Sequence, residues 1–344
     1  MTTTQGLFLL SFFFLLLISC QSDKQMDKVR AYFTYPATEL KYENAGIQMI
    51  PIETPVGKFK VWTKRFGNHP TVKILLLHGG PAMTHEYMEC FETFFGKEGF
   101  EFYEYDQLGS YYSDQPKDTS LWHLDRFVEE VEQVRKALKL EKDNFYLLGN
   151  SWGGILGMQY ALKYQQHLKG LIVCNMQASF ARYAQYNAKL RSQMPTSFMD
   201  SIYAFEKANK YTDSTYNYMV LTKYYTKHLC RIPLDKWPDG LNRSFKHVNS
   251  PIYVMMQGPS EFKAGGNLVG WDIMDRLKEI SVPTLMVGAK YDTMDPEDMK
   301  KQSELVQKGK FLYCPNGSHL SMWDDQEVFM KGIIDFVHEV DEKK

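Results

Sequence analysis

A serine lies between two glycines in the segment GNSWG, which spans residues 149–153. The apolar run Phe145–Leu148 precedes this segment, and a stretch with helical periodicity begins at Gly153. A G-x-S-x-G serine at a strand-to-helix turn exposes its hydroxyl, and the flanking glycines let neighbouring backbone pass close by. The N-terminus of the following helix favours negative charge near the serine. The motif in this setting predicts that Ser151 is a nucleophile.

A serine nucleophile needs a general base, and the base needs an acidic group that orients it. Of the nine histidines, His319 is the best placed, because it follows the apolar run FLYC at 311–314. Asp292 follows the apolar run TLMV at 284–287 more closely than its rival Asp295 does. A single histidine or aspartate is usually a solvated loop residue. Three residues in the order Ser151, Asp292, His319, each just after a predicted strand, predict a catalytic triad.

The oxyanion that forms when a serine attacks a carbonyl needs two backbone N–H donors. Trp152, directly after the predicted nucleophile, supplies one of them. The second is expected from the loop LHGGP at 77–81, which follows an earlier apolar run, and Gly80 is the candidate. His78 in this loop is expected to be a buried residue that braces the loop rather than a base.

These residues can meet only if the strands before them end at the same edge of a sheet. From residue 72 onward, short apolar runs alternate with amphipathic stretches, which is typical of β-α-β units around a parallel sheet. The predicted strands are Val72–Leu77, Phe100–Tyr105, Phe145–Leu148, Leu171–Cys174, Thr284–Val287 and Phe311–Cys314. The predicted helices are His85–Phe95, Asp125–Leu140, Gly153–Tyr164, Pro296–Gln307 and Gln326–Val340. An antiparallel hairpin is expected at the sheet edge, formed by Gly46–Ile50 and Lys58–Thr63.

The stretch 176–277 interrupts this rhythm, because it is rich in Tyr, Lys, Asn and Met and mostly helical in pattern. Predicted strands flank it on both sides, so we interpret it as an insertion and not as a terminal domain. It is expected to form a mainly helical cap over the carboxyl ends of the strands, where open α/β sheets place their sites. The core then consists of residues 46–175 and 278–344.

Six short motifs stand in this order along the chain: HGGP at 78–81, DQLGS at 106–110, GNSWGG at 149–154, GPSEF at 258–262, WD at 271–272 and SHLSMW at 318–323. Together they resemble the prolyl aminopeptidase (proline iminopeptidase) family of α/β-hydrolases, over about residues 56–340. The resemblance implies an α/β-hydrolase fold, with a mostly parallel sheet, helices on both faces and an inserted cap. It also implies release of N-terminal proline or other apolar residues from short peptides. The family uses a triad, here Ser151, Asp292 and His319, with no metal and no cofactor.

An aminopeptidase must hold a free α-amino group, and carboxylates in the cap are suitable partners. The resemblance implies such a role for Glu261, which stands in the GPSEF segment; the alternative is an exposed surface glutamate. A second cap carboxylate, expected before the pair WP at 237–238, is not evident in the sequence. Asp235 and Asp239 are nearby substitutes.

Two departures from the family pattern leave the triad intact and concern substrate preference. Ala82 follows HGGP where the family usually has glycine, and two tyrosines stand at 111–112 where a small residue is common. Because the second cap carboxylate is not evident, a second interpretation is an esterase or amidase of the same fold that acts on small apolar substrates without a free amine. A third is a non-catalytic binding protein on a hydrolase scaffold, since a fold alone does not establish activity.

The N-terminal residues 7–18, LFLLSFFFLLLI, form an uncharged apolar run. A membrane-spanning helix needs about 20 such residues, so this shorter run is typical of a signal peptide. It ends just before Cys20 in a pattern that resembles the bacterial lipoprotein box. We therefore predict a signal peptide over 1–19, lipid attachment at Cys20 and a tether over 20–45, with a plain secretory signal as the alternative. The mature protein is expected to be anchored to a bacterial membrane, at its periplasmic or cell-surface face.

The composition limits the partners. The chain of 344 residues is 44% hydrophobic and 24% charged, which is ordinary for a globular protein with a substantial core. Its 40 basic and 41 acidic residues give a net charge of −1, which argues against nucleic acid as a partner. Besides Cys20, four cysteines remain, and they allow three complete pairings among which the sequence does not choose: Cys90, Cys174, Cys230 and Cys314. The oligomeric state is left open.

Overall fold

The computed structural model of this chain describes residues 46–342 together with Lys28 and Tyr32. The predicted signal peptide, Cys20 and most of the predicted tether lie outside the described residues. Among the helices that are described, none is both long enough and apolar enough to cross a membrane.

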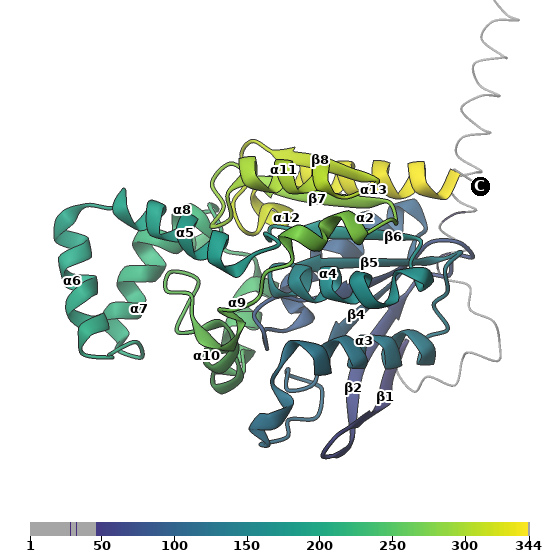
Figure 1. Ribbon diagram of the computed structural model, residues 1–344, viewed down its shortest axis with the longest axis horizontal. Helices are drawn as coiled ribbons and strands as arrows, with labels where there is room; N and C mark the ends of the chain where they lie inside the picture. Colours follow the sequence, from purple (N-terminus) through teal and green to yellow (C-terminus); the bar gives the residue numbers. More distant parts are fainter. Residues whose placement is uncertain (1–27, 29–31, 33–45, 343–344) are drawn as a thin grey trace, which may run out of the picture.

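Eight strands form one sheet in the order β1-β2-β4-β3-β5-β6-β7-β8 (Figure 1). The pairs β1-β2 and β2-β4 are antiparallel, and every pair from β4-β3 to β7-β8 is parallel. The strands β3 to β8 therefore all end at the same edge of the sheet, which is where the predicted catalytic residues follow. The strands are β1 (Ile47–Thr54), β2 (Gly57–Phe66), β3 (Lys73–Leu77), β4 (Glu101–Asp106), β5 (Phe145–Asn150), β6 (Gly170–Cys174), β7 (Thr284–Ala289) and β8 (Gly309–Cys314).

Helices cover both faces of the sheet, and each face has its own apolar core. Leu75 and Leu77 of β3 pack in one cluster with residues of α3 and α4, whereas Ile74 and Leu76 pack in another with α2 and α13. Because successive residues of a strand point to opposite faces, one strand supplies both cores. This arrangement confirms the predicted α/β fold class. The helices are α2 (Cys90–Glu98), α3 (Leu124–Ala137), α4 (Trp152–Tyr164), α11 (Pro296–Leu305), α12 (Ser321–Asp324) and α13 (Gln326–Glu342).

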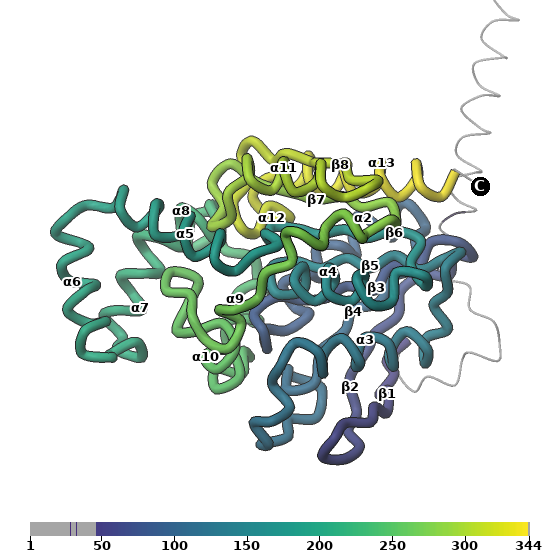
Figure 2. Tube along the Cα trace, in the orientation of Figure 1, coloured from purple at the N-terminus to yellow at the C-terminus, as the bar shows by residue number. Residues whose placement is uncertain are grey.

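Between β6 and β7 the chain leaves the sheet and forms a group of mostly short helices beyond one end of it (Figures 1 and 2). We call residues 176–277 the cap. It contains a small apolar core of its own, which includes Ile202, Tyr216, Tyr224 and Phe262. Its α-helices are α5 (Phe180–Ser192), α6 (Thr196–Lys207), α7 (Ser214–Val220), α8 (Thr226–His228), α9 (Asp239–His247) and α10 (Ser250–Gln257), with a π-helical turn, η5, at Leu221–Tyr225.

The helix predicted over His85–Phe95 is wrong in one respect, because two separate elements occupy this stretch. A 3₁₀ turn, η2, spans His85–Met88, and α2 begins only at Cys90. The buried carboxylate of Asp106 accepts hydrogen bonds from both the main-chain N–H and the ring Nδ1 of His85, each at 2.9 Å. At the end of η2 the N–H of Glu89 donates to Glu86 O, three residues back, at 3.3 Å, so the turn closes in the 3₁₀ pattern before α2 begins.

Candidate active site

Ser151 occupies a sharp turn between β5 and α4. Its backbone has φ 55° and ψ −124°, a conformation that non-glycine residues adopt rarely and mostly at functional sites. A Cβ on Gly149 would lie 2.0 Å from the Gly153 carbonyl oxygen, and one on Gly153 would lie 2.1 Å from Leu77 O. The two glycines of the motif are therefore required by backbone packing, and they allow the turn that carries the serine.

His319 and Asp292 lie together after the ends of β8 and β7. The ring Nδ1 of His319 is 2.8 Å from Asp292 Oδ1, and both side chains are buried. A carboxylate accepts hydrogen bonds, so Nδ1 carries the proton and Nε2 of the neutral ring is left as the basic atom. The rival candidate, Asp295, accepts from the N–H of Glu297 and caps the N-terminus of α11. Its side chain is thus engaged at a helix end.

The surroundings of His319 act on its pKa in opposite directions. Burial lowers the pKa, because it penalises the charged ring, while the charge of Asp292 and its hydrogen bond raise it. The negative charge of Glu261 also raises it, and the net result is a pKa above the ordinary value of histidine. A protonated His319 is therefore stabilised in the site, as is needed by a base that must carry a proton between two steps of a reaction.

The two candidate oxyanion donors come from the start of α4 and from the HGGP loop. Trp152 is the first residue of α4, where main-chain N–H groups have no partner within the helix. In the HGGP loop, the N–H of Gly79 donates to the hydroxyl of Tyr87 at 2.6 Å, which leaves Gly80 as the glycine whose N–H can serve a ligand. Gly80 has φ 110°, and a Cβ there would lie 2.6 Å from the main-chain nitrogen of Met83. A side chain is therefore excluded at this position.

His78 braces this loop, as the sequence predicts. Its Nε2 accepts from the main-chain N–H of Gln107 at 3.1 Å, and the Gln107 side chain donates back to His78 O at the same distance. Burial lowers the pKa of His78 to about 4, so its ring is neutral at neutral pH. Gln107 also accepts from the indole N–H of Trp152 at 2.7 Å. The loop and the residue after the serine are thus held to one another.

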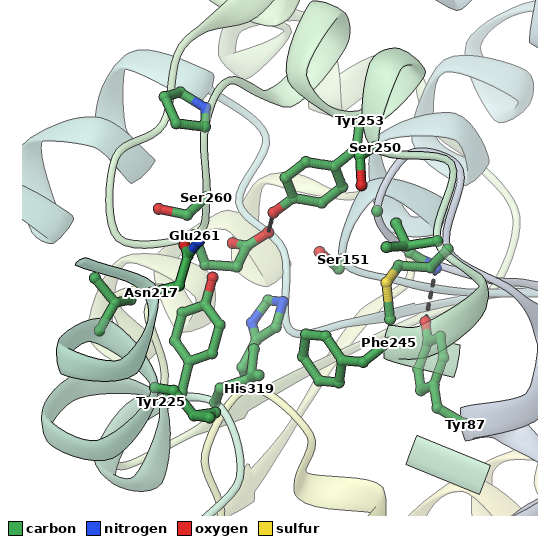
Figure 3. A pocket seen from close by; sticks show the side chains of 18 of the residues that line it. Tyr87, Ser151, Asn217, Tyr225, Phe245, Ser250, Tyr253, Ser260, Glu261 and His319 are labelled. Carbon is green, nitrogen blue, oxygen red and sulfur yellow. Dashed lines mark hydrogen bonds between the residues drawn. The ribbon is translucent and has the colours of Figure 1, made fainter. Parts of the chain in front are cut away.

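A cavity of about 470 Å³ opens between the sheet edge and the cap. Ser151, His319 and Glu261 all line it, and Figure 3 shows their side chains around the same space. Most of the remaining wall is apolar and comes from the cap, including Val220, Tyr225, Leu229, Leu241, Phe245 and Val254. The cavity therefore combines a serine hydroxyl, an imidazole and a carboxylate with walls suited to an apolar side chain.

Glu261 is buried, with only 6% of its surface exposed, so its alternative as an exposed surface glutamate is wrong. Its carboxylate accepts from the hydroxyl of Tyr183 at 2.8 Å. It also accepts from the hydroxyl of Tyr253 at 3.0 Å (Figure 3). Among the described residues that line the cavity, it is the only carboxylate. Asp235 and Asp239 are both exposed and outside the lining, and Asp239 pairs with Arg243.

Comparison with known proteins agrees with this geometry. Residues 73–326 match the family described as alpha/beta hydrolase fold. The chain is 64% identical over 297 residues to the proline iminopeptidase of Flavobacterium johnsoniae, which covers 86% of this chain and 99% of that protein. The chain belongs to the proline iminopeptidase family. Among solved structures, VinJ superposes with a TM-score of 0.79 at 28% identity, covering 85% of this chain and 99% of VinJ. The proline iminopeptidase of Mycobacterium smegmatis superposes with a TM-score of 0.76 at 26% identity, covering 86% and 98%.

One residue that contacts Asp292 directly was not predicted from the sequence. Asn175, just after β6, donates from its side-chain nitrogen to Asp292 Oδ2 at 2.7 Å and to Ser318 O at 3.1 Å. Its backbone has φ 56°, a left-handed conformation that asparagine tolerates better than most residues. An asparagine directly after the apolar run LIVC was the available signal, since polar residues at this sheet edge face the site.

The two departures from the proline iminopeptidase pattern lie where the core meets the cap. Ala82 is buried with φ 59°, in the region that favours glycine, and its carbonyl accepts from the N–H of Asn249 at 3.0 Å. The ring of Tyr111 stacks on His247 of α9, with centroids 4.1 Å apart and planes 7° apart. Both positions therefore supply contacts between core and cap.

The described residues contain no group of three or more His, Cys, Asp or Glu side chains arranged to hold a metal ion. The four cysteines of the described part of the chain are buried free thiols.

Proposed function

We propose that this protein is a serine aminopeptidase that releases N-terminal proline, or another apolar residue, from short peptides through an acyl-enzyme. Its family membership supports this proposal. The observation that carries it is the buried Glu261 carboxylate, which shares one cavity with Ser151 and His319. A buried carboxylate attracts a protonated amine, and its location in the cavity restricts that amine to the end of a substrate.

In the proposed reaction, Ser151 attacks the carbonyl carbon of the N-terminal residue while Nε2 of His319 takes the hydroxyl proton. Asp292 keeps the ring oriented and stabilises the imidazolium that forms. The N–H groups of Gly80 and Trp152 donate to the oxyanion. His319 then protonates the leaving amine, the peptide bond breaks, and the first residue remains as an ester on Ser151. Water, activated by His319, hydrolyses this ester and regenerates the serine.

The cavity also supports a preference for a short apolar first residue. The hydroxyls of Tyr183 and Tyr253 hold Glu261 in place, so its orientation does not depend on the substrate. Phe245 and Tyr225 line the same cavity and can pack against a pyrrolidine ring. A positioned charge together with apolar walls accounts for selection of both the free amine and the ring.

The test compares proline-β-naphthylamide with its N-acetylated form, using the wild type and Ser151→Ala. We expect the wild type to hydrolyse the free amine and to lose nearly all activity on the blocked one, and Ser151→Ala to hydrolyse neither. Equal rates on the two substrates would instead support the esterase or amidase alternative, which is favoured by the lack of a second carboxylate among the described residues that line the cavity. If a fluorophosphonate fails to label Ser151, the protein is a non-catalytic scaffold.

We also propose that the protein is exported and held to a bacterial membrane by lipid on Cys20. The apolar run at 7–18 and the cysteine that follows it support this proposal. Several acyl chains on one residue anchor a protein stably, whereas a single chain binds only reversibly. The test is detergent phase partition of the protein expressed in a bacterial host. The wild type should enter the detergent phase, and Cys20→Ser should stay in the aqueous phase; equal partition of both would reject the anchor.

A further inference from the structure

A segment of the cap at residues 226–231 contacts both loops that carry the proposed acid and base. The main-chain N–H of His319 donates to His228 O at 3.0 Å, and that of Leu320 donates to Leu229 O at 2.9 Å. The ring Nδ1 of His228 lies 2.9 Å from the carbonyl oxygen of Tyr291, the residue before the triad carboxylate. His228 therefore bonds to the loop that carries His319 through its carbonyl oxygen, and to the loop that carries Asp292 through its ring.

A π-helical turn sets the directions of the side chains in this segment. Tyr225 closes η5 and lines the cavity, and Leu229, just after α8, lines it as well. Tyr224 is fully buried in the cap, and its ring centroid lies 4.8 Å from that of His228. π-helical turns occur frequently at functional sites, because they shift the register of the side chains that follow. Here the same short segment supplies both cavity walls and the histidine that contacts the loops.

The position of the ring proton of His228 follows from its hydrogen-bond partner, the carbonyl oxygen of Tyr291. A carbonyl oxygen only accepts, so Nδ1 of His228 must donate to Tyr291 O. Burial lowers the pKa of His228, as do the charges of Lys227 and Arg231, while the bond to Tyr291 O and the charge of Asp292 raise it. The net shift is downward, so at neutral pH the ring is neutral with its proton on Nδ1.

We propose that His228 is a positioning residue, which holds the loops of Asp292 and His319 at the spacing that the triad needs. This inference rests on the proposed function in that it assumes that Ser151, His319 and Asp292 react together. On the core side, the amide of Asn175 already joins the two loops by its bonds to Asp292 and Ser318 O. His228 joins them from the cap side, through its carbonyl oxygen and its ring.

The segment also connects the triad to the carboxylate proposed to bind the amine. The hydroxyl of Tyr224 donates to Asn187 Oδ1 at 3.1 Å, and the side-chain nitrogen of Asn187 donates to the main-chain oxygen of Glu261. A chain of contacts thus runs from Glu261 through Asn187 and Tyr224 to His228. These contacts connect the carboxylate proposed to bind the amine with the residue that contacts the loops of the proposed triad.

The experiment compares three substitutions of His228 with a neighbouring control. His228→Asn keeps an N–H donor near the position of Nδ1, His228→Gln moves the donor towards Nε2, and His228→Leu removes it. Lys227→Ala is the control, because Lys227 is exposed on the same short helix. For each variant we would measure kcat and KM on proline-β-naphthylamide, the rate of fluorophosphonate labelling of Ser151, and the thermal unfolding midpoint.

Because small misplacements of catalytic groups cost large factors in rate, we expect the Leu and Gln variants to lose about tenfold in kcat and in labelling rate, with KM within about twofold. The Asn variant and Lys227→Ala should stay within about threefold of the wild type. If His228→Leu does not fold, the comparison of Asn with Gln decides. Equal rates for these two, or a change in KM alone, would overturn the proposal. Labelling does not need an amine substrate, so it still ranks the variants if the aminopeptidase proposal fails.

Discussion

Replacing Glu261 by glutamine removes one negative charge from the cavity and leaves the size and shape of the side chain almost unchanged. In the wild type this carboxylate is buried and bonded to two tyrosine hydroxyls, which rotate freely enough to accept from an amide as well. The substitution should therefore leave the cavity intact. It leaves the ammonium group of a bound substrate without an opposite charge.

The size of the effect follows from the burial of this carboxylate. Truncating one partner of a buried, hydrogen-bonded charge pair costs about 2–5 kcal/mol. Glutamine keeps an oxygen that can accept from the ammonium, so we expect the lower half of that range, about 2–3.5 kcal/mol. With about 1.4 kcal/mol for each factor of ten, kcat/KM on proline-β-naphthylamide should fall roughly 30- to 300-fold.

The assay measures kcat/KM on the free amide and, separately, the rate of fluorophosphonate labelling at Ser151, which needs no amine. Asp235→Asn is the matched control, because Asp235 is a cap carboxylate that is exposed and outside the cavity lining. We expect Glu261→Gln to lose activity on the amide and to retain labelling within about threefold, since a neutral probe gains little from the carboxylate. Our reasoning would be refuted if Glu261→Gln kept its activity on the amide, or if labelling fell by the same factor.

Three further predictions concern the charge, the orientation and the packing of the site. Because the charge of Glu261 raises the pKa of His319, Glu261→Gln should shift the acidic limb of the labelling rate to lower pH; an unmoved limb in a pH series would contradict this. Asn175→Gly removes the donor to the triad carboxylate without straining the backbone, and a hydrogen bond to a charged group is worth about 1.5–3 kcal/mol, so kcat should fall about tenfold or more at unchanged KM; an unchanged kcat would exclude this role. Gly153→Ala places a Cβ 2.1 Å from the backbone of β3 and should lower the thermal unfolding midpoint or prevent folding. As a control in the same helix, a Cβ at Gly157 would meet only side-chain carbons, at 3.4 Å or more. Gly157→Ala should therefore be tolerated, or stabilise the protein by about 0.5–1 kcal/mol. Similar unfolding midpoints for the two variants would count against the packing argument.

The sheet and the order of the polar residues after its strands could be predicted because both depend on short-range patterns. Apolar runs such as 145–148 and 284–287 correspond to β5 and β7, with ends displaced by two residues. Parallel strands bring their carboxyl ends to one edge whatever lies between them, so residues as distant as Ser151, Asp292 and His319 could be grouped from their positions after strands alone. The structure brings Asp292 and His319 into contact and places Ser151 and His319 on one cavity.

The contacts of the cap could not be predicted in this way, because its short helices have no fixed relation to the sheet. Glu261 could be predicted only through the resemblance of its motif, and its carboxylate is bonded to Tyr183, 78 positions away in the chain. Asn175 and His228 carried no motif. Their partners are set by how two loops and a π-helical turn pack together, and no periodicity in the sequence reports such packing.

In this protein the cap does more than line the substrate cavity. It also contacts the two core loops that carry the proposed acid, Asp292 (the acid loop), and the proposed base, His319 (the base loop). The base loop receives hydrogen-bond acceptors from the cap at the main-chain oxygens of His228 and Leu229, and the acid loop receives a donor from the His228 ring. On the other flank, Arg243 and His247 of α9 pair with Glu86 of the core. Because the cap is bonded to the core next to the proposed triad, we expect substitutions in the cap to alter the rate of the chemical step as well as substrate preference. Changes of specificity engineered in the cap should therefore be judged by kcat and labelling rate together with KM.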